Sequence, residues 1–522
     1  MTVGGNRRVP QGKIDKIIIR PICEGLHTFS LVEQPAFKEL LTTLNPQCKV
    51  ISRPTVRTRL EASAIQMKKN VMSHLSKVSY VATTTDCWTA HQQSFIGVTG
   101  HLVDEETFER RSAVLACKRL RGSHTFDVLA GALDDIHCQY RIRGKVVRTT
   151  TDSGSNFVKA FSVFGEQSQS EDAESDAESD RDSIDDEPTA NYLDTFSILE
   201  QDNGLEYQLP THQRCACHLL NLVATTDAEI AEKKMDTYKR LSRAAFGKCQ
   251  AMWNNMGHSY MAAEVVEDHC RLQLIRPNQT RWNSTFMAVE RIIRIIQEKG
   301  EEAIRNICEE FKLKTLTQAE IAFLTDYCSV MKPLVKALNI LQSETNTHLG
   351  WLLPVICQLQ AKLKRQETSS KMCLPLIKAI QDGVQKRFGE MMMDPELIAA
   401  AILLPKFKTT WTERPDVIET GLAYVRQHLD QMAEVEVEQV GQHSSDEDDF
   451  FSSMKSRRSE GTGELEGYLA CIPNDMDLLN SFPNLKKLSE TQHWPACFSC
   501  LRAAFQLCWI TVHCKASKDE LN

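Results

Sequence analysis

The residues best suited to chemistry are two aspartates that end the same short pattern. Residues 83–86 and 149–152 both read Thr-Thr-Thr-Asp. Threonine and valine before each aspartate favour a β-strand. Two strands that end at one rim would bring Asp86 and Asp152 together, and paired carboxylates suit a divalent cation such as Mg²⁺, which prefers oxygen ligands. Either aspartate alone also suits a turn cap, but the doubled pattern favours the metal interpretation.

The segments around the two aspartates indicate an α/β layer that holds both on one edge. A strand ending at Asp86 is followed by two more strands in an antiparallel meander, then a helix, then the strand ending at Asp152. The next turn leads into a short helix, which Asn156 is placed to cap. The expected second and third strands, the helix between strands and the last helix are Ser94–Val103, Arg110–Leu120, Asp127–Tyr140 and Phe157–Phe161.

The second half of the chain is dominated by helical periodicity. The clearest predicted helices are Phe286–Phe311, Gln318–Gln342, Trp351–Arg365, Leu374–Met393 and Pro395–Leu404. The patterns divide the chain into a helical leader (1–76), an α/β core (77–227), a helical domain (228–440), an acidic linker (441–463) and a C-terminal segment (464–522).

The net charge of −8 comes mostly from one segment. Residues 168–188 hold ten Asp or Glu and one Arg, a net charge of −9, so the remainder carries −8 − (−9) = +1. The acidic residues 167–190 contain too few apolar side chains to offset the entropy of ordering, and we expect them to be disordered. The rest of the chain is nearly neutral and can therefore carry basic patches that attract nucleic acid.

Several protein classes are disfavoured by composition. No apolar run is long enough to cross a bilayer, so no membrane partner is expected. Eighteen cysteines without a secretory signal indicate a reducing compartment and free thiols. There is no glycine-rich phosphate loop, and nothing points to a small-molecule substrate.

Four short stretches, in this order, resemble the hAT superfamily of DNA transposases, especially domesticated vertebrate members found with BED-type zinc fingers. They are Thr85–Thr89, Thr151–Asn156, Arg214–His218 with Asn221, and Thr280–Thr285. The resemblance implies a ribonuclease-H-like core interrupted by a large all-α insertion, a nuclear location, DNA as partner and a link to transcription regulation. Nothing before Asp86 has the cysteine and histidine spacing of a zinc finger, so none is expected.

The resemblance also assigns roles to particular residues. Asp86 and Asp152 match two of the three acidic residues that hold two Mg²⁺ or Mn²⁺ ions for DNA cleavage. Cys215 and His218 match a Cys-x-x-His motif beside the active site, where they would orient DNA; packing at a helix start, with a satisfied histidine, is the alternative. Arg281 with Trp282 matches a pair in the insertion that would contact a phosphate and stack on an unpaired base. A Trp buried between helices is the alternative.

The C-terminal segment departs from the family pattern. Residues 468–488 resemble the start of the family's dimerisation segment, which implies a homodimer. Where the catalytic Glu is expected, the chain has Leu501. The cysteines and histidine at Cys497, Cys500 and His513 have poor spacing for zinc. We therefore expect a DNA-associated protein that has lost catalysis; an active metal-dependent transposase or nuclease, and an adaptor without DNA binding, are the alternatives.

Overall fold

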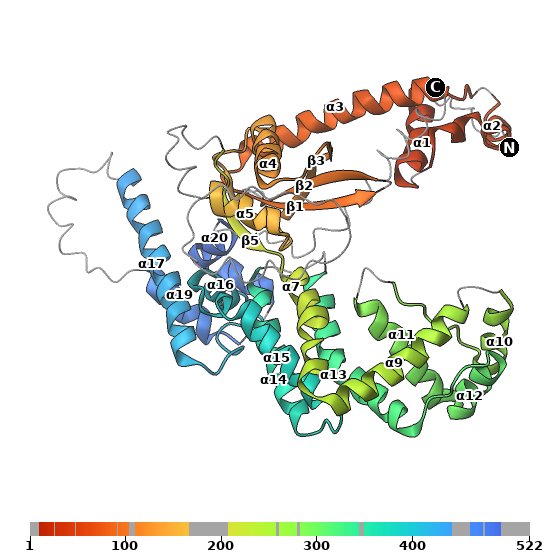
Figure 1. Ribbon diagram of the computed structural model, residues 1–522. Coiled ribbons are helices and arrows are strands. Elements are labelled where there is room, and N and C mark those ends of the chain that lie inside the picture. Colours follow the sequence, from red (N-terminus) through yellow and green to blue (C-terminus); the bar gives the residue numbers. More distant parts are fainter. Residues whose placement is uncertain are drawn as a thin grey trace, which may run out of the picture. The chain divides into compact units, whose positions relative to one another are not determined.

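A computed structural model of the chain describes residues 10–25, 27–46, 48–90, 92–103, 110–165, 207–256, 260–278, 282–343, 349–440, 460–472 and 475–491 (Figure 1). Its described residues form two compact units that meet in sequence between Gln213 and Arg214. We call residues up to Gln213 the sheet unit and residues from Arg214 the helical unit. The domain boundary expected from the sequence lies slightly later, at 227/228.

The sheet unit begins with a small helical module. It consists of α1 (Gln11–Glu24), η1 (Phe29–Glu33), α2 (Pro35–Leu44) and the start of α3 (Arg53–Lys77). Ile18, Val32 and Val56 belong to its apolar core. Asp15 is fully buried and is held by Gln11 (Nε2–Oδ1, 2.7 Å) and Arg59 (Nη1–Oδ2, 2.6 Å). The buried carboxylate thus ties α1 to α3.

Five strands form one mixed sheet in the order β3-β2-β1-β4-β5. They are β1 (Val81–Ala90), β2 (Gln93–Val103), β3 (Arg110–Leu120), β4 (Val146–Thr151) and β5 (Thr211–Arg214). The first three strands pair antiparallel, and β4 pairs parallel with β1. This topology is ribonuclease-H-like, and it confirms the predicted meander followed by a helix and a further strand.

Two helices cover one face of this sheet (Figure 1). They are α4 (Phe126–Tyr140), which joins β3 to β4, and α5 (Ser155–Phe164), which follows β4. Leu133 of α4 and Phe157 of α5 belong to one buried cluster with Ile96 of β2. The Tyr140 hydroxyl donates to the Leu115 carbonyl at 2.7 Å. Burial of this apolar layer fixes the face of the sheet on which the helices lie.

Three details of the sheet unit differ from the prediction. β1 does not end at Asp86 but continues to Ala90, because its second half still pairs with β2. Asn156 does not cap α5; the N-cap is Gly154. The short strand β5 was not predicted, since four mostly polar residues show no apolar alternation that would mark a strand.

The helical unit contains a long series of helices that share one apolar core. In chain order the described ones are α7 (Ala216–Leu222), η2 (Val223–Asp227), α8 (Ile230–Lys234), α9 (Asp236–Met256), α10 (Tyr260–Cys270), α11 (Trp282–Lys299), α12 (Glu301–Glu310), α13 (Gln318–Leu341), η3 (Leu349–Trp351), α14 (Leu352–Glu367), α15 (Leu374–Phe388), η4 (Met391–Met393), α16 (Pro395–Ile402), α17 (Pro415–Val440), α19 (Glu460–Ala470), η7 (Met476–Ser481) and α20 (Pro483–Thr491). The helix expected over 286–311 is two helices, because Gly300 takes a positive φ of 85° between them.

One buried ion pair joins the start of the helical unit to its middle. Arg387 of α15 donates to Asp227 at the end of η2, with Nε–Oδ2 at 2.6 Å and Nη2–Oδ1 at 3.0 Å. Both side chains are almost completely buried. Gly383 makes room for the pair, since a Cβ at this position would lie 2.6 Å from Asp227 Oδ2. The contact between η2 and α15 therefore depends on a glycine, a carboxylate and a guanidinium.

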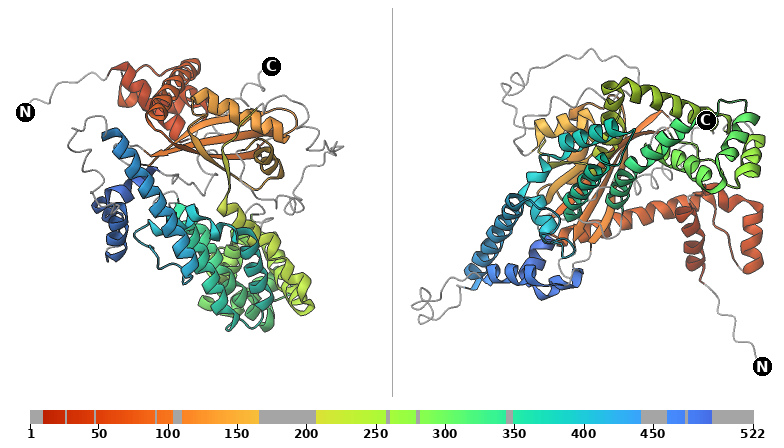
Figure 2. Two further views of the ribbon diagram at one scale, coloured as in Figure 1. Left: turned by 90° about the vertical axis from the view of Figure 1, so that its left-hand side faces the viewer. Right: turned by 90° about the horizontal axis from the view of Figure 1, so that it is seen from below.

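The described part of the C-terminal segment packs within the helical unit (Figure 2). Leu465 and Tyr468 of α19 and Leu485 of α20 are buried in its core. The Tyr468 hydroxyl donates to the Ile402 carbonyl at 3.1 Å, and Lys408 Nζ donates to the Tyr468 carbonyl at 2.9 Å. No helix among the described residues combines the length and apolarity needed to cross a membrane.

Candidate metal and nucleic-acid site

Asp86 and Asp152 lie on neighbouring parallel strands. In the β1–β4 register, Thr83 pairs with Thr149 and Thr84 with Thr150. Two residues beyond the second pair come Asp86, within β1, and Asp152, which directly follows β4. The two Thr-Thr-Thr-Asp segments are therefore in register on adjacent strands, and the two aspartates lie at the same level along the strand direction.

The threonines beneath the aspartates hold the two strands together. The hydroxyls of Thr83 and Thr149 are 2.7 Å apart and fully buried. Thr84 bonds through its hydroxyl to Nε2 of His101 on β2, at 3.1 Å. Because side chains alternate along a strand, Asp86 shares the face of Thr84. Its partner on β2 is Gly97, which has no side chain to cover it.

The turn after β4 is shaped by Asp152 and its neighbours. Asp152 Oδ1 accepts a hydrogen bond from the Gly154 backbone N–H at 3.2 Å. The Thr151 hydroxyl lies 2.8 Å from Nε2 of His212 on β5, and the His212 ring stacks on Phe161 of α5 at a centroid distance of 4.5 Å. One oxygen of Asp152 therefore acts as a turn cap, as the alternative interpretation of this residue expected.

The pKa of the Cys87 thiol reflects the negative charge of both aspartates. Burial raises the pKa of its thiol far above the usual range, and the negative charges of Asp152 and then Asp86 raise it further. Both carboxylates therefore act on the same buried sulfur atom. The raised pKa keeps the thiol protonated at neutral pH.

The described residues do not fit a two-metal centre. Such a centre needs enough anionic oxygens to hold both cations, and among the described residues no three His, Cys, Asp or Glu side chains are grouped to hold a metal ion. Glu464, an acidic residue of the C-terminal segment, caps α20: Oε1 accepts from Asn484 N and Oε2 from Asn484 Nδ2, both at 2.9 Å. Leu501 and the cysteines and histidine at Cys497, Cys500 and His513 lie outside the described residues.

Cys215 and His218 lie at the start of the helical unit. Cys215 is the buried N-cap residue of α7, and its carbonyl accepts from Leu219 N at 3.0 Å. Nε2 of His218 is buried without a hydrogen-bond partner among the described residues. The packing interpretation expected a histidine whose ring is hydrogen-bonded, but Nε2 of His218 has no such bond to a described residue.

Arg281 lies outside the described residues, and Trp282 is the first residue of α11. Asn278, the last described residue before them, is bound by Ser284 of α11. The Ser284 hydroxyl donates to the Asn278 carbonyl at 2.7 Å and accepts from the Asn278 N–H at 2.9 Å. Trp282 therefore lies at the start of a helix of the helical unit.

His212 is the site residue that the sequence analysis missed. It contacts both Thr151 and Phe161, so it supports the segment that carries Asp152. The only available signal was a histidine in the polar stretch just before Cys215. That signal is too weak to identify a strand or a contact partner.

Comparison with known proteins gives distant similarities. The chain is 22% identical over 336 residues to "Putative transcriptional regulator tpeD" of Talaromyces stipitatus, covering 62% of the chain and 38% of that protein. It is 25% identical over 289 residues to "Putative AC9 transposase" of Zea mays (54% and 30%) and 25% identical over 264 residues to "Putative AC transposase" of Zea mays (50% and 28%). The chain spans about a third of the length of these relatives. No family model matches it.

Proposed function

We propose that this chain is a transposase-derived nuclear protein that associates with DNA and has lost DNA cleavage. One observation carries the proposal: a ribonuclease-H-like sheet sets Asp86 and Asp152 at the same level on parallel strands, and no third carboxylate completes a metal centre among the described residues. The distant similarity to two maize proteins named as transposases supports the DNA association. The two aspartates would hold at most one Mg²⁺ or Mn²⁺ ion, weakly.

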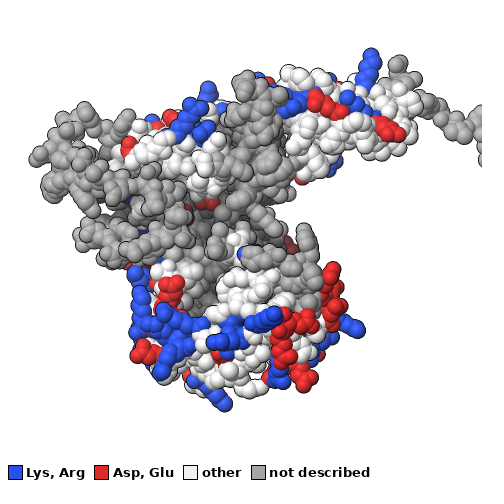
Figure 3. All heavy atoms as spheres, turned by 45° about the vertical axis from the view of Figure 1, so that its right-hand side comes forward, with Lys and Arg blue, Asp and Glu red and all other residues white. Residues whose placement is uncertain are grey.

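The DNA contacts are assigned to the helical unit and its entry. Arg281 would hold a phosphate and Trp282 would stack on an unpaired base, while Cys215 and His218 would orient DNA. On the face of the helical unit drawn in Figure 3, basic side chains predominate over one part and acidic side chains over another, with some of the opposite sign in each. In the sheet unit, α3 carries six Lys or Arg and one Glu. Such separation lets a near-neutral chain attract a polyanion.

Regulation of transcription is the role that fits a DNA-associated chain without cleavage. The fungal relative is named as a transcriptional regulator. The described C-terminal helices α19 and α20 contribute to the core of the helical unit. An adaptor that binds proteins alone remains the rival function, and DNA binding separates the two.

The test is binding of purified full-length chain to fluorescent DNA with an unpaired segment. Trp282→Ala is expected to weaken binding while leaving the melting temperature nearly unchanged, because stacking on a base contributes roughly 1–3 kcal/mol. Trp253→Phe is the matched control, since Trp253 is 2% exposed in the core of the helical unit. That variant should lower the melting temperature and leave binding intact. A Trp282→Ala effect confined to stability would favour the buried-Trp alternative.

A further inference from the structure

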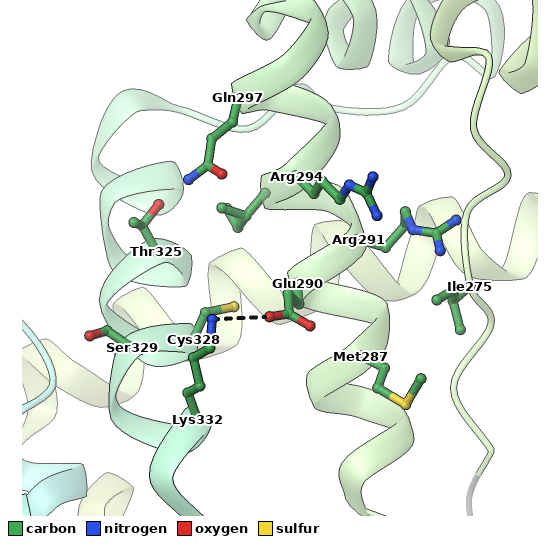
Figure 4. A pocket seen from close by; sticks show the side chains of 11 residues that line it. Ile275, Met287, Glu290, Arg291, Arg294, Gln297, Thr325, Cys328, Ser329 and Lys332 are labelled. Carbon is green, nitrogen blue, oxygen red and sulfur yellow. Dashed lines mark ion pairs between the residues drawn. The ribbon is translucent and has the colours of Figure 1, made fainter. Parts of the chain in front are cut away.

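A hollow of about 530 Å³ lies between α11 and α13 of the helical unit (Figure 4). Each helix contributes a stripe of side chains spaced three or four residues apart, which places them on one helix face. The α11 stripe includes Met287, Arg291 and Arg294, and the α13 stripe includes Thr325, Ser329 and Lys332. We call this hollow the α11–α13 groove.

Positive charge predominates among the lining residues. The lining includes three cations, Arg291, Arg294 and Lys332, and one carboxylate, Glu290. Lys332 Nζ lies 3.9 Å from Glu290 Oε1, and both side chains are largely exposed (73% and 46%). An exposed pair at this distance contributes little, roughly 0–1 kcal/mol. Lys332 is therefore available to a stronger anion.

The two arginines are held in place but keep donors for a ligand. Arg291 Nη1 donates to the Gln273 carbonyl at 2.7 Å. Arg294 uses Nε for Glu298 on its own helix, at 2.6 Å, an exposed pair just beyond the lining. Its Nη groups make no hydrogen bond to any residue that the structure describes. Two guanidinium groups one turn apart are well suited to phosphate oxygens, which they bind through paired N–H donors.

The remaining lining is apolar or neutral. Met287 is 47% exposed, and Ile275 and Ile293 also line the hollow. Thr325 and Ser329 line the hollow from α13 (Figure 4). A carboxylate-rich peptide would satisfy the cations but would not use an apolar surface. A nucleic-acid strand offers phosphates together with flat apolar bases, and proteins that bind single strands combine basic grooves with such surfaces.

We propose that the α11–α13 groove binds the backbone of single-stranded nucleic acid, with phosphates at Arg291 and Arg294 and a base against Met287. This inference rests on the proposed DNA association and names a site for it. The site is distinct from Trp282, which precedes Met287 by more than one turn of the same helix.

The experiment is fluorescence anisotropy of a labelled oligothymidine 20-mer with the full chain between 50 and 200 mM salt. In the double variant Arg291→Gln/Arg294→Gln, the slope of log affinity against log salt should become shallower by about 1.4, because each single-strand phosphate contact adds about 0.7. If the variant and the unmodified chain bind equally well at 1 M salt, this change in slope corresponds to a loss of affinity on the order of 25-fold at 0.1 M salt. Melting temperatures check that each variant is folded.

The control is Arg305→Gln/Arg365→Gln, which removes the same charge from exposed positions on α12 and α14. It should change the slope little. Ser329→Glu adds a carboxylate to the groove without touching either arginine, and it should weaken binding more than Asn306→Glu on exposed α12. These two pairs separate a local contact from a general effect of net charge.

The outcomes are distinguishable. If the unmodified chain does not bind the oligonucleotide or duplex DNA, the proposed function fails. If it binds and the groove variants match their controls, the groove assignment is overturned and the proposed function stands. If those variants bind DNA normally but lose binding of a peptide with the sequence of residues 168–188, the occupant is the acidic segment of this chain, and the nucleic-acid assignment is wrong.

Discussion

At Asp86 the neighbouring backbone decides what surrounds the carboxylate. Its antiparallel partner on β2 is Gly97, so no side chain stands opposite it. Asp152 has a different setting, because one of its oxygens already accepts from Gly154 N. The two aspartates are therefore unequal: Asp86 lies within a strand, half-buried and opposite a glycine, and Asp152 is partly committed to a turn.

We expect His137 of α4 to make the stability of the sheet unit depend on pH. Burial lowers its pKa to about 4; Asp134 opposes this, and Arg143 adds to it. An unfolded histidine titrates near pH 6.5, so between about pH 6.5 and 4 the unfolded chain takes up a proton that the folded chain does not. Unfolding is thus favoured as pH falls, by up to about 3 kcal/mol at the lower end.

Hydrogen exchange of α4 amides between pH 4.5 and 7.5, corrected for intrinsic rates, measures this dependence. His137→Leu should flatten it, since Nε2 of His137 has no hydrogen-bond partner among the described residues. His74→Gln, at an exposed position of α3, is the control and should leave the dependence unchanged. An equal slope in the two variants would contradict the assignment.

At the scale of elements, the contact between η2 and α15 should be unusually sensitive to one methyl group. Replacing a glycine inside a helix by alanine ordinarily stabilises the helix by about 1 kcal/mol. At Gly383 the new Cβ would lie 2.7 Å from Asp227 Cβ and force the ion pair with Arg387 apart. Disrupting a buried pair costs roughly 3–5 kcal/mol, so Gly383→Ala should lower the melting temperature.

Gly247 in α9 provides the matched control, because a Cβ there meets nothing within 4 Å. Thermal unfolding should show Gly247→Ala equal to or above the unmodified chain and Gly383→Ala well below it. A rise for both variants would show that Asp227 can move aside at little cost.

The elements also show where sequence reasoning succeeds. The strands before Asp86 and Asp152 were predictable because β-branched residues are consecutive there. The helices over 318–341 and 374–388 were predictable from their apolar period. The extension of β1 to Ala90, the break at Gly300 and the strand holding His212 were not. Each depends on a contact distant in sequence or on a single backbone angle, and neither leaves a periodic pattern.

At the scale of the whole molecule, we propose self-association through the C-terminal segment. Ile472 is 95% exposed and Met476 47% exposed beside buried helices of that segment. Light scattering at micromolar concentration should give the mass of a dimer, and Ile472→Glu/Met476→Glu should lower it. Ile65→Glu/Met67→Glu on exposed α3 is the control. A monomer in the unmodified chain would contradict the proposal.

Loss of cleavage is a prediction about the whole chain, because a third metal ligand would have to come from outside the described surroundings of Asp86 and Asp152. The sequence between Glu490 and Asp519 contains no carboxylate, so shifting the alignment at Leu501 by one residue supplies none. Glu464 is engaged at the start of α20 by Asn484. We therefore expect this 522-residue chain not to nick supercoiled plasmid or hairpin DNA with Mg²⁺ or Mn²⁺.

Asp86→Ala is the control that separates this chain's own activity from a contaminating nuclease. Nicking that persists in the Asp86→Ala preparation would be attributed to contamination. Nicking that disappears in it would refute the prediction and show that a carboxylate joins Asp86 and Asp152. In that case Glu464→Gln distinguishes the source: it keeps a side-chain oxygen that can accept from Asn484 but removes the negative charge that a second metal ion needs, so it would abolish nicking only if Glu464 leaves α20 to bind metal.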